Sequence, residues 1–142
     1  MTIDHGVVLD ASLTLAWALP DEASTYTDAI LRFVASGKAW VPDLWAHEVA
    51  NGLVMAQRRG RITAAQRALF IEEVFKLPIE VVRAPSRSVL ELQAELADRY
   101  SLTVYDAAYL DLALRKGLPL ATQDKALCAA AGKAGIGIAK AR

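Results

Sequence analysis

Short apolar runs alternate along this chain with longer segments of helical periodicity, and that alternation limits the possible folds more than any other feature. The five runs lie at 6–9, 38–41, 79–82, 118–122 and 136–138. Each is short and apolar, as expected of a parallel strand that is covered on both faces. Strands that alternate with helices indicate a parallel sheet joined by right-handed crossovers. We therefore predict a single α/β domain over residues 1–142, with about five parallel strands and helices on both faces.

The helical segments carry recognisable start and stop signals. The segment 21–36 is predicted to be a helix that ends at Gly37. Capping-box patterns, in which a hydroxyl residue is followed three positions later by a polar partner, begin at Thr63, Ser88 and Thr103. No internal repeat or Pro/Gly-rich linker interrupts the chain, which is consistent with one domain.

Four acidic residues lie where this topology would bring the ends of strands and the starts of helices together: Asp10, Glu48, Asp106 and Asp124. In open parallel sheets, ligands bind outside the carboxyl ends of the strands. Carboxylates crowded at that edge raise one another's pKa unless a counter-charge is present. A hard divalent cation such as Mg²⁺ supplies that charge and prefers oxygen ligands. The sequence therefore predicts a metal-binding acidic cluster, with Ser12, Asn51 and Thr122 as supporting polar residues.

Each of these acids also has an ordinary structural interpretation. Asp10 and Asp124 could cap the helices that follow them. Asp106 occupies the third position of a capping-box pattern, where a negative charge also favours the helix dipole. Glu48 and Asn51 could form a solvated stripe on an otherwise apolar helix. The metal-site hypothesis depends on the four acids acting together.

Charge and cysteine content limit the function in other ways. The chain has 16 Lys and Arg residues together and 16 Asp and Glu residues together, so its formal net charge is zero. A protein that binds nucleic acid by neutralising many phosphates is usually strongly basic, so contact with RNA would depend on a local patch or on a metal. The candidate patch is Arg58, Arg59 and Arg61. The single cysteine, Cys128, and the absence of a signal-peptide pattern or of a long apolar run predict a cytoplasmic protein.

Four ordered motifs resemble those of the PIN-domain ribonucleases, and most closely those of the VapC toxins of bacterial toxin–antitoxin pairs. They are VLDAS at 8–12, PDLWAHEVANGL at 42–53, LTVYDAAY at 102–109 and LATQD at 120–124. The resemblance implies endonucleolytic cleavage of RNA that depends on Mg²⁺ or Mn²⁺. It places Asp10 and Asp106 at the main metal-ligand positions, with Glu48 and Asp124 completing the acidic cluster. It also implies a homodimer that a cognate antitoxin protein silences.

Other interpretations stay open at this point. A housekeeping PIN nuclease would have the same motifs, and a non-catalytic partner-binding domain could retain the fold. His47 and Glu48 begin a pattern that misses the zinc-protease motif H-E-x-x-H, because Asn51 replaces its second histidine. Asp10 to Thr14 loosely resembles the opening of haloacid-dehalogenase phosphatases, but the second carboxylate of that motif is missing.

Overall fold

A computed structural model describes residues 5–83 and 85–140. The strands are β1 (Val7–Leu9), β2 (Ala39–Pro42), β3 (Ile79–Val82) and β4 (Leu120–Ala121). The helices are α1 (Ala11–Ala16), α2 (Thr25–Ser36), α3 (Leu44–Arg58), α4 (Ala64–Val74), α5 (Arg87–Tyr100), α6 (Val104–Lys116) and α7 (Lys125–Lys133), with a 3-10 turn, η1, at Pro20–Glu22. No helix within the described ranges has the length and apolar character needed to cross a membrane.

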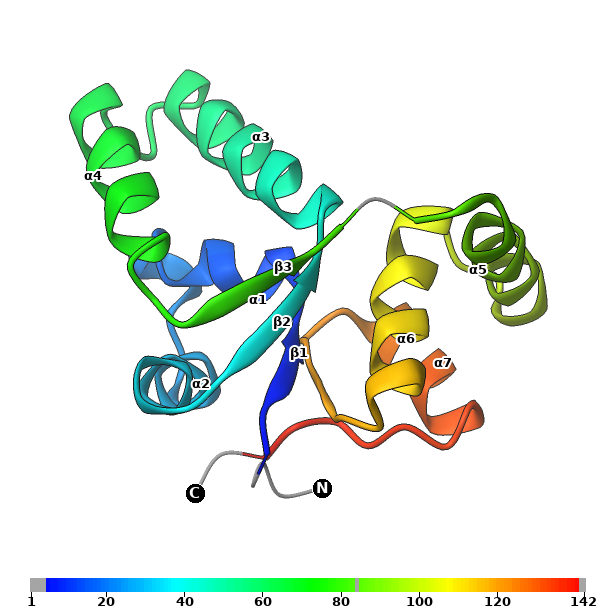
Figure 1. Ribbon diagram of the computed structural model, residues 1–142. Helices are drawn as coiled ribbons and strands as arrows, with labels where there is room; N and C mark the ends of the chain where they lie inside the picture. Colours follow the sequence, from blue (N-terminus) through cyan, green and yellow to red (C-terminus); the bar gives the residue numbers. More distant parts are fainter. Residues whose placement is uncertain (1–4, 84, 141–142) are drawn as a thin grey trace.

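The strands form one parallel sheet in the order β3-β2-β1-β4. The fifth predicted run contributes a single parallel bridge between Ile138 and Leu120 at the β4 edge. Helices α1 to α4 lie on one side of this sheet, and α5, α6 and α7 lie on the other (Figure 1). The predicted α/β architecture is therefore confirmed.

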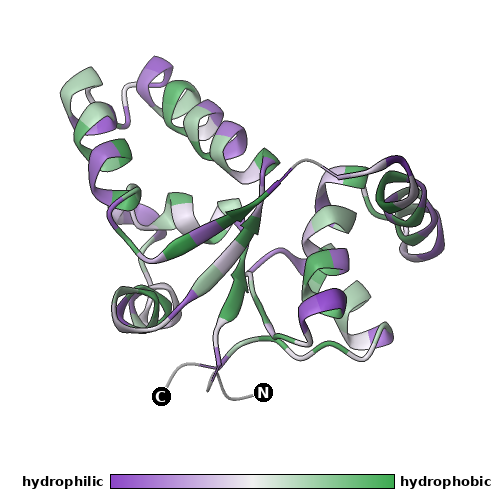
Figure 2. Cartoon of the chain, viewed as in Figure 1, coloured by the Kyte–Doolittle hydropathy of each residue, from purple (hydrophilic) through white to green (hydrophobic). Residues whose placement is uncertain are grey.

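The core is centred on β1, whose three residues are completely buried. Figure 2 shows this strand coloured as hydrophobic, as expected of a central parallel strand. On one face, α6 packs between the sheet and α5, and every residue from Ala107 to Ala113 is buried. The acidic residues that follow β1 and that lie in the first turn of α6 are therefore carried by buried elements of the core.

Two predicted helix starts are wrong by a few residues. The helix expected from Asp21 begins at Thr25, because Pro20 opens a separate 3-10 turn and the Ser24 side chain accepts a hydrogen bond from the Thr27 N–H. The predicted cap at Ser88 lies inside α5. Ser86 caps that helix instead, accepting from the Val89 N–H. Both serines have the chemistry of a cap, and the earlier one adds two residues to the helix.

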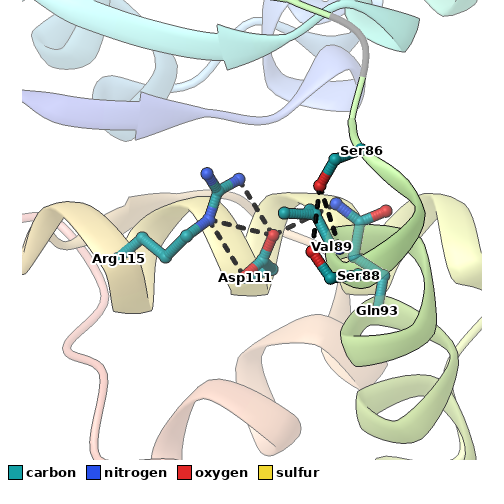
Figure 3. A network of polar contacts seen from close by, with 6 residues as sticks. All are labelled: Ser86, Ser88, Val89, Gln93, Asp111 and Arg115. Carbon is teal, nitrogen blue, oxygen red and sulfur yellow. Dashed lines mark hydrogen bonds and ion pairs between the residues drawn. The ribbon is translucent and has the colours of Figure 1, made fainter.

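A buried polar network joins α5 to α6 (Figure 3). The Asp111 carboxylate is 1% exposed and accepts a hydrogen bond from the Gln93 amide at 3.1 Å. Arg115 Nη2 lies 2.9 Å from Asp111 Oδ2, and its Nε–H donates to Oδ1 at 3.1 Å. This network holds α5 against the helix that carries Asp106.

We expect Asp111→Ala to lower the free energy of unfolding by about 1–3 kcal/mol, because the buried Gln93 amide loses its acceptor. Urea unfolding measures this loss. Glu91→Ala is the matched control, since Glu91 forms an exposed pair with Arg87 on α5, and such pairs contribute little. Equal stability of the two variants would show that the buried network does not stabilise the α5–α6 contact.

Candidate active site

A pocket of about 360 Å³ lies at the carboxyl ends of the strands. Its lining includes all four predicted acids together with Ser12 and Asn51: the full set is Asp10, Ala11, Ser12, Leu15, Glu48, Asn51, Gly52, Asp106 and Asp124. These residues come from the end of β1, from α1, α3 and the first turn of α6, and from the start of α7. The fold thus gathers residues that are up to 114 positions apart in the sequence (10 to 124) around one cavity.

Asp10 is the most enclosed of the four acids, at 5% exposed. Its Oδ2 accepts hydrogen bonds from Ser12 Oγ at 2.5 Å and from Thr122 Oγ1 at 2.7 Å. Although Asp10 occupies the N-cap position of α1, its side chain makes no capping hydrogen bond. Within the described part of the chain, both of these hydrogen bonds go to Oδ2 and none is made to Oδ1.

Glu48 lies in the second turn of α3 and is half-buried. Its Oε1 accepts a 2.7 Å hydrogen bond from the hydroxyl of Tyr109. Burial raises the pKa of the Glu48 carboxyl; the Tyr109 hydrogen bond opposes that shift, and the nearby charges of Asp10 and Asp106 add to it. Mutual repulsion between Glu48 and its neighbours therefore acts within the pocket.

Asp106 and Asp124 are placed by helix caps. Thr103 Oγ1 accepts from the Asp106 N–H at 3.0 Å, which fixes the first turn of α6. The Asp124 carboxylate itself caps α7, because its Oδ1 accepts from the Leu127 N–H at 2.8 Å. Burial raises the pKa of the Asp106 carboxyl, and the charges of Asp124 and Asp10 raise it further. The capping interpretation of Asp124 is correct, and the same residue also lines the pocket.

Sequence analysis missed Tyr109, which has no exposed surface and is the hydrogen-bond partner of Glu48. It follows Asp106 by three positions on α6, so the two side chains lie on neighbouring parts of the same helix face. That spacing could have indicated that Tyr109 lies near the acidic cluster. It could not indicate that the hydroxyl contacts an acid from α3, because this contact depends on how α3 and α6 are placed around the sheet.

The donor set fits a hard divalent cation. It consists of carboxylate, hydroxyl and amide oxygens, and none of the lining residues is basic. In the residues that the structure describes, no three His, Cys, Asp or Glu side chains are arranged to hold a metal ion together. Oxygen donors are those that Mg²⁺ prefers, and this ion keeps several waters and takes only one or two protein carboxylates. The zinc interpretation is disfavoured because His47 is exposed and is not among the lining residues.

The predicted arginine patch lies away from this pocket. Arg58 and Arg59 are exposed at the end of α3. Ten residues of helix separate Arg58 from Glu48, roughly 15 Å along the axis. Arg61 pairs with Asp21 at 2.9 Å and with Glu22 at 3.1 Å, so part of its charge is already neutralised.

The raised pKa values of Glu48 and Asp106 predict how the metal-free protein responds to pH. Because the folded state binds these protons more tightly than the unfolded state, the stabilisation is fully present below the unfolded pKa values. This stabilisation is lost as the pH rises through the pKa values that the two carboxyls have in the folded state. We expect the wild-type protein in EDTA to gain more stability between pH 7 and pH 5 than a Glu48→Gln/Asp106→Asn variant. Thermal unfolding at the two pH values measures the difference. An equal change in stability for the two proteins would mean that folding does not raise the pKa values of these two carboxyls.

Comparison with known proteins agrees with this geometry. The family described as PIN domain matches residues 7–133. Ribonuclease VapC3 of Pyrobaculum aerophilum is 32% identical over 121 residues, which cover 85% of this chain and 91% of that protein. The crystal structure of PAE2754 from Pyrobaculum aerophilum superposes with a TM-score of 0.69 at 26% identity, covering 89% of this chain and 84% of that one. FitAcB from Neisseria gonorrhoeae shares the fold, with a TM-score of 0.62 at 13% identity over 94% of this chain and 96% of that one.

Proposed function

Because this chain belongs to the PIN-domain family, we propose that it is an endoribonuclease that depends on Mg²⁺ or Mn²⁺. The observation that carries the proposal is the pocket, in which four carboxylates converge and no basic side chain among the lining residues neutralises them. The name of its relative, Ribonuclease VapC3, points to RNA as the substrate. The reaction is hydrolysis of an internal phosphodiester bond.

In this proposal Asp10 and Asp106 hold the cation, and Glu48 and Asp124 complete the acidic cluster. When bound, the cation activates water as a nucleophile and stabilises negative charge on the phosphoryl group. Ser12 and Thr122 keep Oδ2 of Asp10 occupied, so that Oδ1 is the oxygen offered to the pocket.

Substrate contacts other than those of the acids use neutral and basic side chains. Asn51 is exposed in the pocket lining, and its amide can donate a hydrogen bond to a phosphate oxygen. Arg58 and Arg59 are exposed at the end of α3, where they can contact the RNA backbone, whereas Arg61 is held by Asp21 and Glu22. With zero net charge overall, the protein relies on these few contacts and on the cation for RNA affinity.

The biological role that we propose is the toxin of a toxin–antitoxin pair, acting in the cytoplasm as a homodimer. The similarity to Ribonuclease VapC3 over most of both chains supports this role. The cognate antitoxin is then a protein that blocks the acidic pocket. A housekeeping ribonuclease of the same family is the alternative. Co-purification of the chain with the product of a small neighbouring gene would support the toxin role.

A titration of Mn²⁺ against thermal stability tests the metal site and separates it from a non-catalytic scaffold. A ligand that binds only the folded state raises its stability, by about 2.7 kcal/mol at a hundred-fold excess over Kd. We expect the wild-type protein to melt at a higher temperature in Mn²⁺. If the acids serve only as helix caps and surface charges, Mn²⁺ will leave the melting temperature unchanged.

A further inference from the structure

Tyr109 is a buried residue that touches the acidic pocket without lining it. We propose that Tyr109 is a positioning residue, whose hydroxyl holds the Glu48 carboxylate in place across the pocket and thereby sets the affinity of the site for its divalent cation. This inference rests on the proposed function, because it assigns Tyr109 a part in the same metal site.

The hydrogen bond joins two elements that approach the site from opposite sides. Tyr109 is carried by α6 and Glu48 by α3, which flank the sheet in Figure 1. The donor oxygen lies 2.7 Å from Glu48 Oε1, the usual distance for an O–H···O hydrogen bond. Tyr109 is 0% exposed on a helix that packs between the sheet and α5, so its hydroxyl has a fixed position.

Glu48 needs such a partner more than Asp10 or Asp124 does. Asp10 has a short side chain and two hydroxyl donors, Ser12 and Thr122, and Asp124 is fixed by the cap of α7. A glutamate has one more rotatable bond than an aspartate, so fixing its carboxylate costs more conformational entropy. Within the described residues, the Tyr109 hydroxyl is the only side-chain donor to Glu48. It occupies Oε1 and leaves Oε2 for the pocket.

A buried tyrosine hydroxyl requires some acceptor, and satisfying it is the simpler interpretation of this contact. Two features indicate that this contact also positions Glu48. The acceptor is an acid of the pocket rather than a backbone carbonyl. The donor is completely buried on α6, whereas the acceptor is carried by α3, so the contact ties this acid to a second element of the fold. The hydroxyl therefore sets the position of Glu48 before any ligand arrives.

The test is calorimetric binding of Mn²⁺ to the wild-type chain, Tyr109→Phe, Glu48→Ala and the double variant. Loss of a residue that orients the groups of a metal site typically costs 10- to 100-fold in metal affinity, and we expect a weakening of roughly that size for Tyr109→Phe. In the Glu48→Ala background, the same change should have no further effect, because the residue through which Tyr109 acts is gone. Tyr100→Phe is the matched control. Tyr100 is a partly buried tyrosine at the end of α5 with no described hydrogen bond to an acid, and its loss of a hydroxyl should leave Mn²⁺ affinity unchanged.

Three outcomes would overturn the inference. Wild-type Mn²⁺ affinity in Tyr109→Phe would show that Glu48 is held without the hydroxyl. An equal loss in the Glu48→Ala background would show that Tyr109 acts independently of Glu48, through general packing. A wild-type chain that neither binds Mn²⁺ nor cleaves RNA would overturn the proposed function and this inference together, whereas the first two outcomes leave the proposed function intact.

Discussion

Asp10→Asn is expected to reduce RNA cleavage by at least about a hundred-fold, which corresponds to a loss of roughly 3 kcal/mol of transition-state stabilisation. The substitution removes a charge from the site without changing the shape of the side chain. Its remaining carbonyl oxygen can still accept from Ser12 and Thr122, the two hydroxyls that hold Oδ2 in the wild type. The amide nitrogen then faces the pocket, where it cannot bind a cation.

The same variant should fold normally. Removing one negative charge from a cluster that has no basic neighbour in its lining relieves repulsion, so the melting temperature in EDTA should be unchanged or higher. In Mn²⁺ the variant should lose most of the thermal shift seen for the wild type. Asp98→Asn, which changes an exposed aspartate on α5, is the control and should cleave at the wild-type rate. Wild-type turnover by Asp10→Asn would show that the metal assignment is wrong.

The second large effect is expected on stability. Trp45→Ala should lower the free energy of unfolding by about 3–5 kcal/mol, the usual cost of removing a large aromatic side chain from a core. Trp45 is 1% exposed, and its Nε1–H donates to Thr14 Oγ1 at 3.0 Å. Thr14 in turn donates to the carbonyl of Asp10 at 3.1 Å. The indole therefore connects α3 to α1 directly beneath the acidic pocket.

Chemical denaturation of Trp45→Ala and Trp45→Phe separates packing from hydrogen bonding. Trp45→Phe keeps most of the ring volume and loses one hydrogen bond, which is worth about 1 kcal/mol, so it should be much the milder change. If Trp45→Ala costs no more than Trp45→Phe, the indole is not an essential part of the core.

The acidic site was largely predictable because it follows from strand direction. Asp10 follows β1 and Asp124 follows β4, and these two strands are adjacent and parallel, so their carboxyl ends must lie together. Asp106 is in the first turn of a helix whose cap, Thr103, was visible in the sequence. Such local signals, combined with one rule of topology, bring the acids to the same edge of the sheet.

Contacts between helices were not predictable in the same way. Asp111 has the sequence character of a solvent-facing helix residue, yet it is 1% exposed, because α5 covers it and supplies Gln93 as its partner. The Tyr109–Glu48 bond likewise depends on the relative placement of α6 and α3. Hydrophobic periodicity indicates which face of a helix is buried but does not indicate which polar group it will meet there. For that reason the acids were found and their buried partners were missed.

The most direct test of the central claim is cleavage of labelled single-stranded and structured RNAs by the purified chain in Mn²⁺. The same reactions are run in EDTA and after Mn²⁺ is restored. If the acidic pocket is a metal-dependent ribonuclease site, the RNAs will be cut at defined internal positions, cutting will stop in EDTA, and it will return with the metal. Cleavage that continues unchanged in EDTA, or a protein that Mn²⁺ stabilises but that cuts none of these RNAs, would contradict the account.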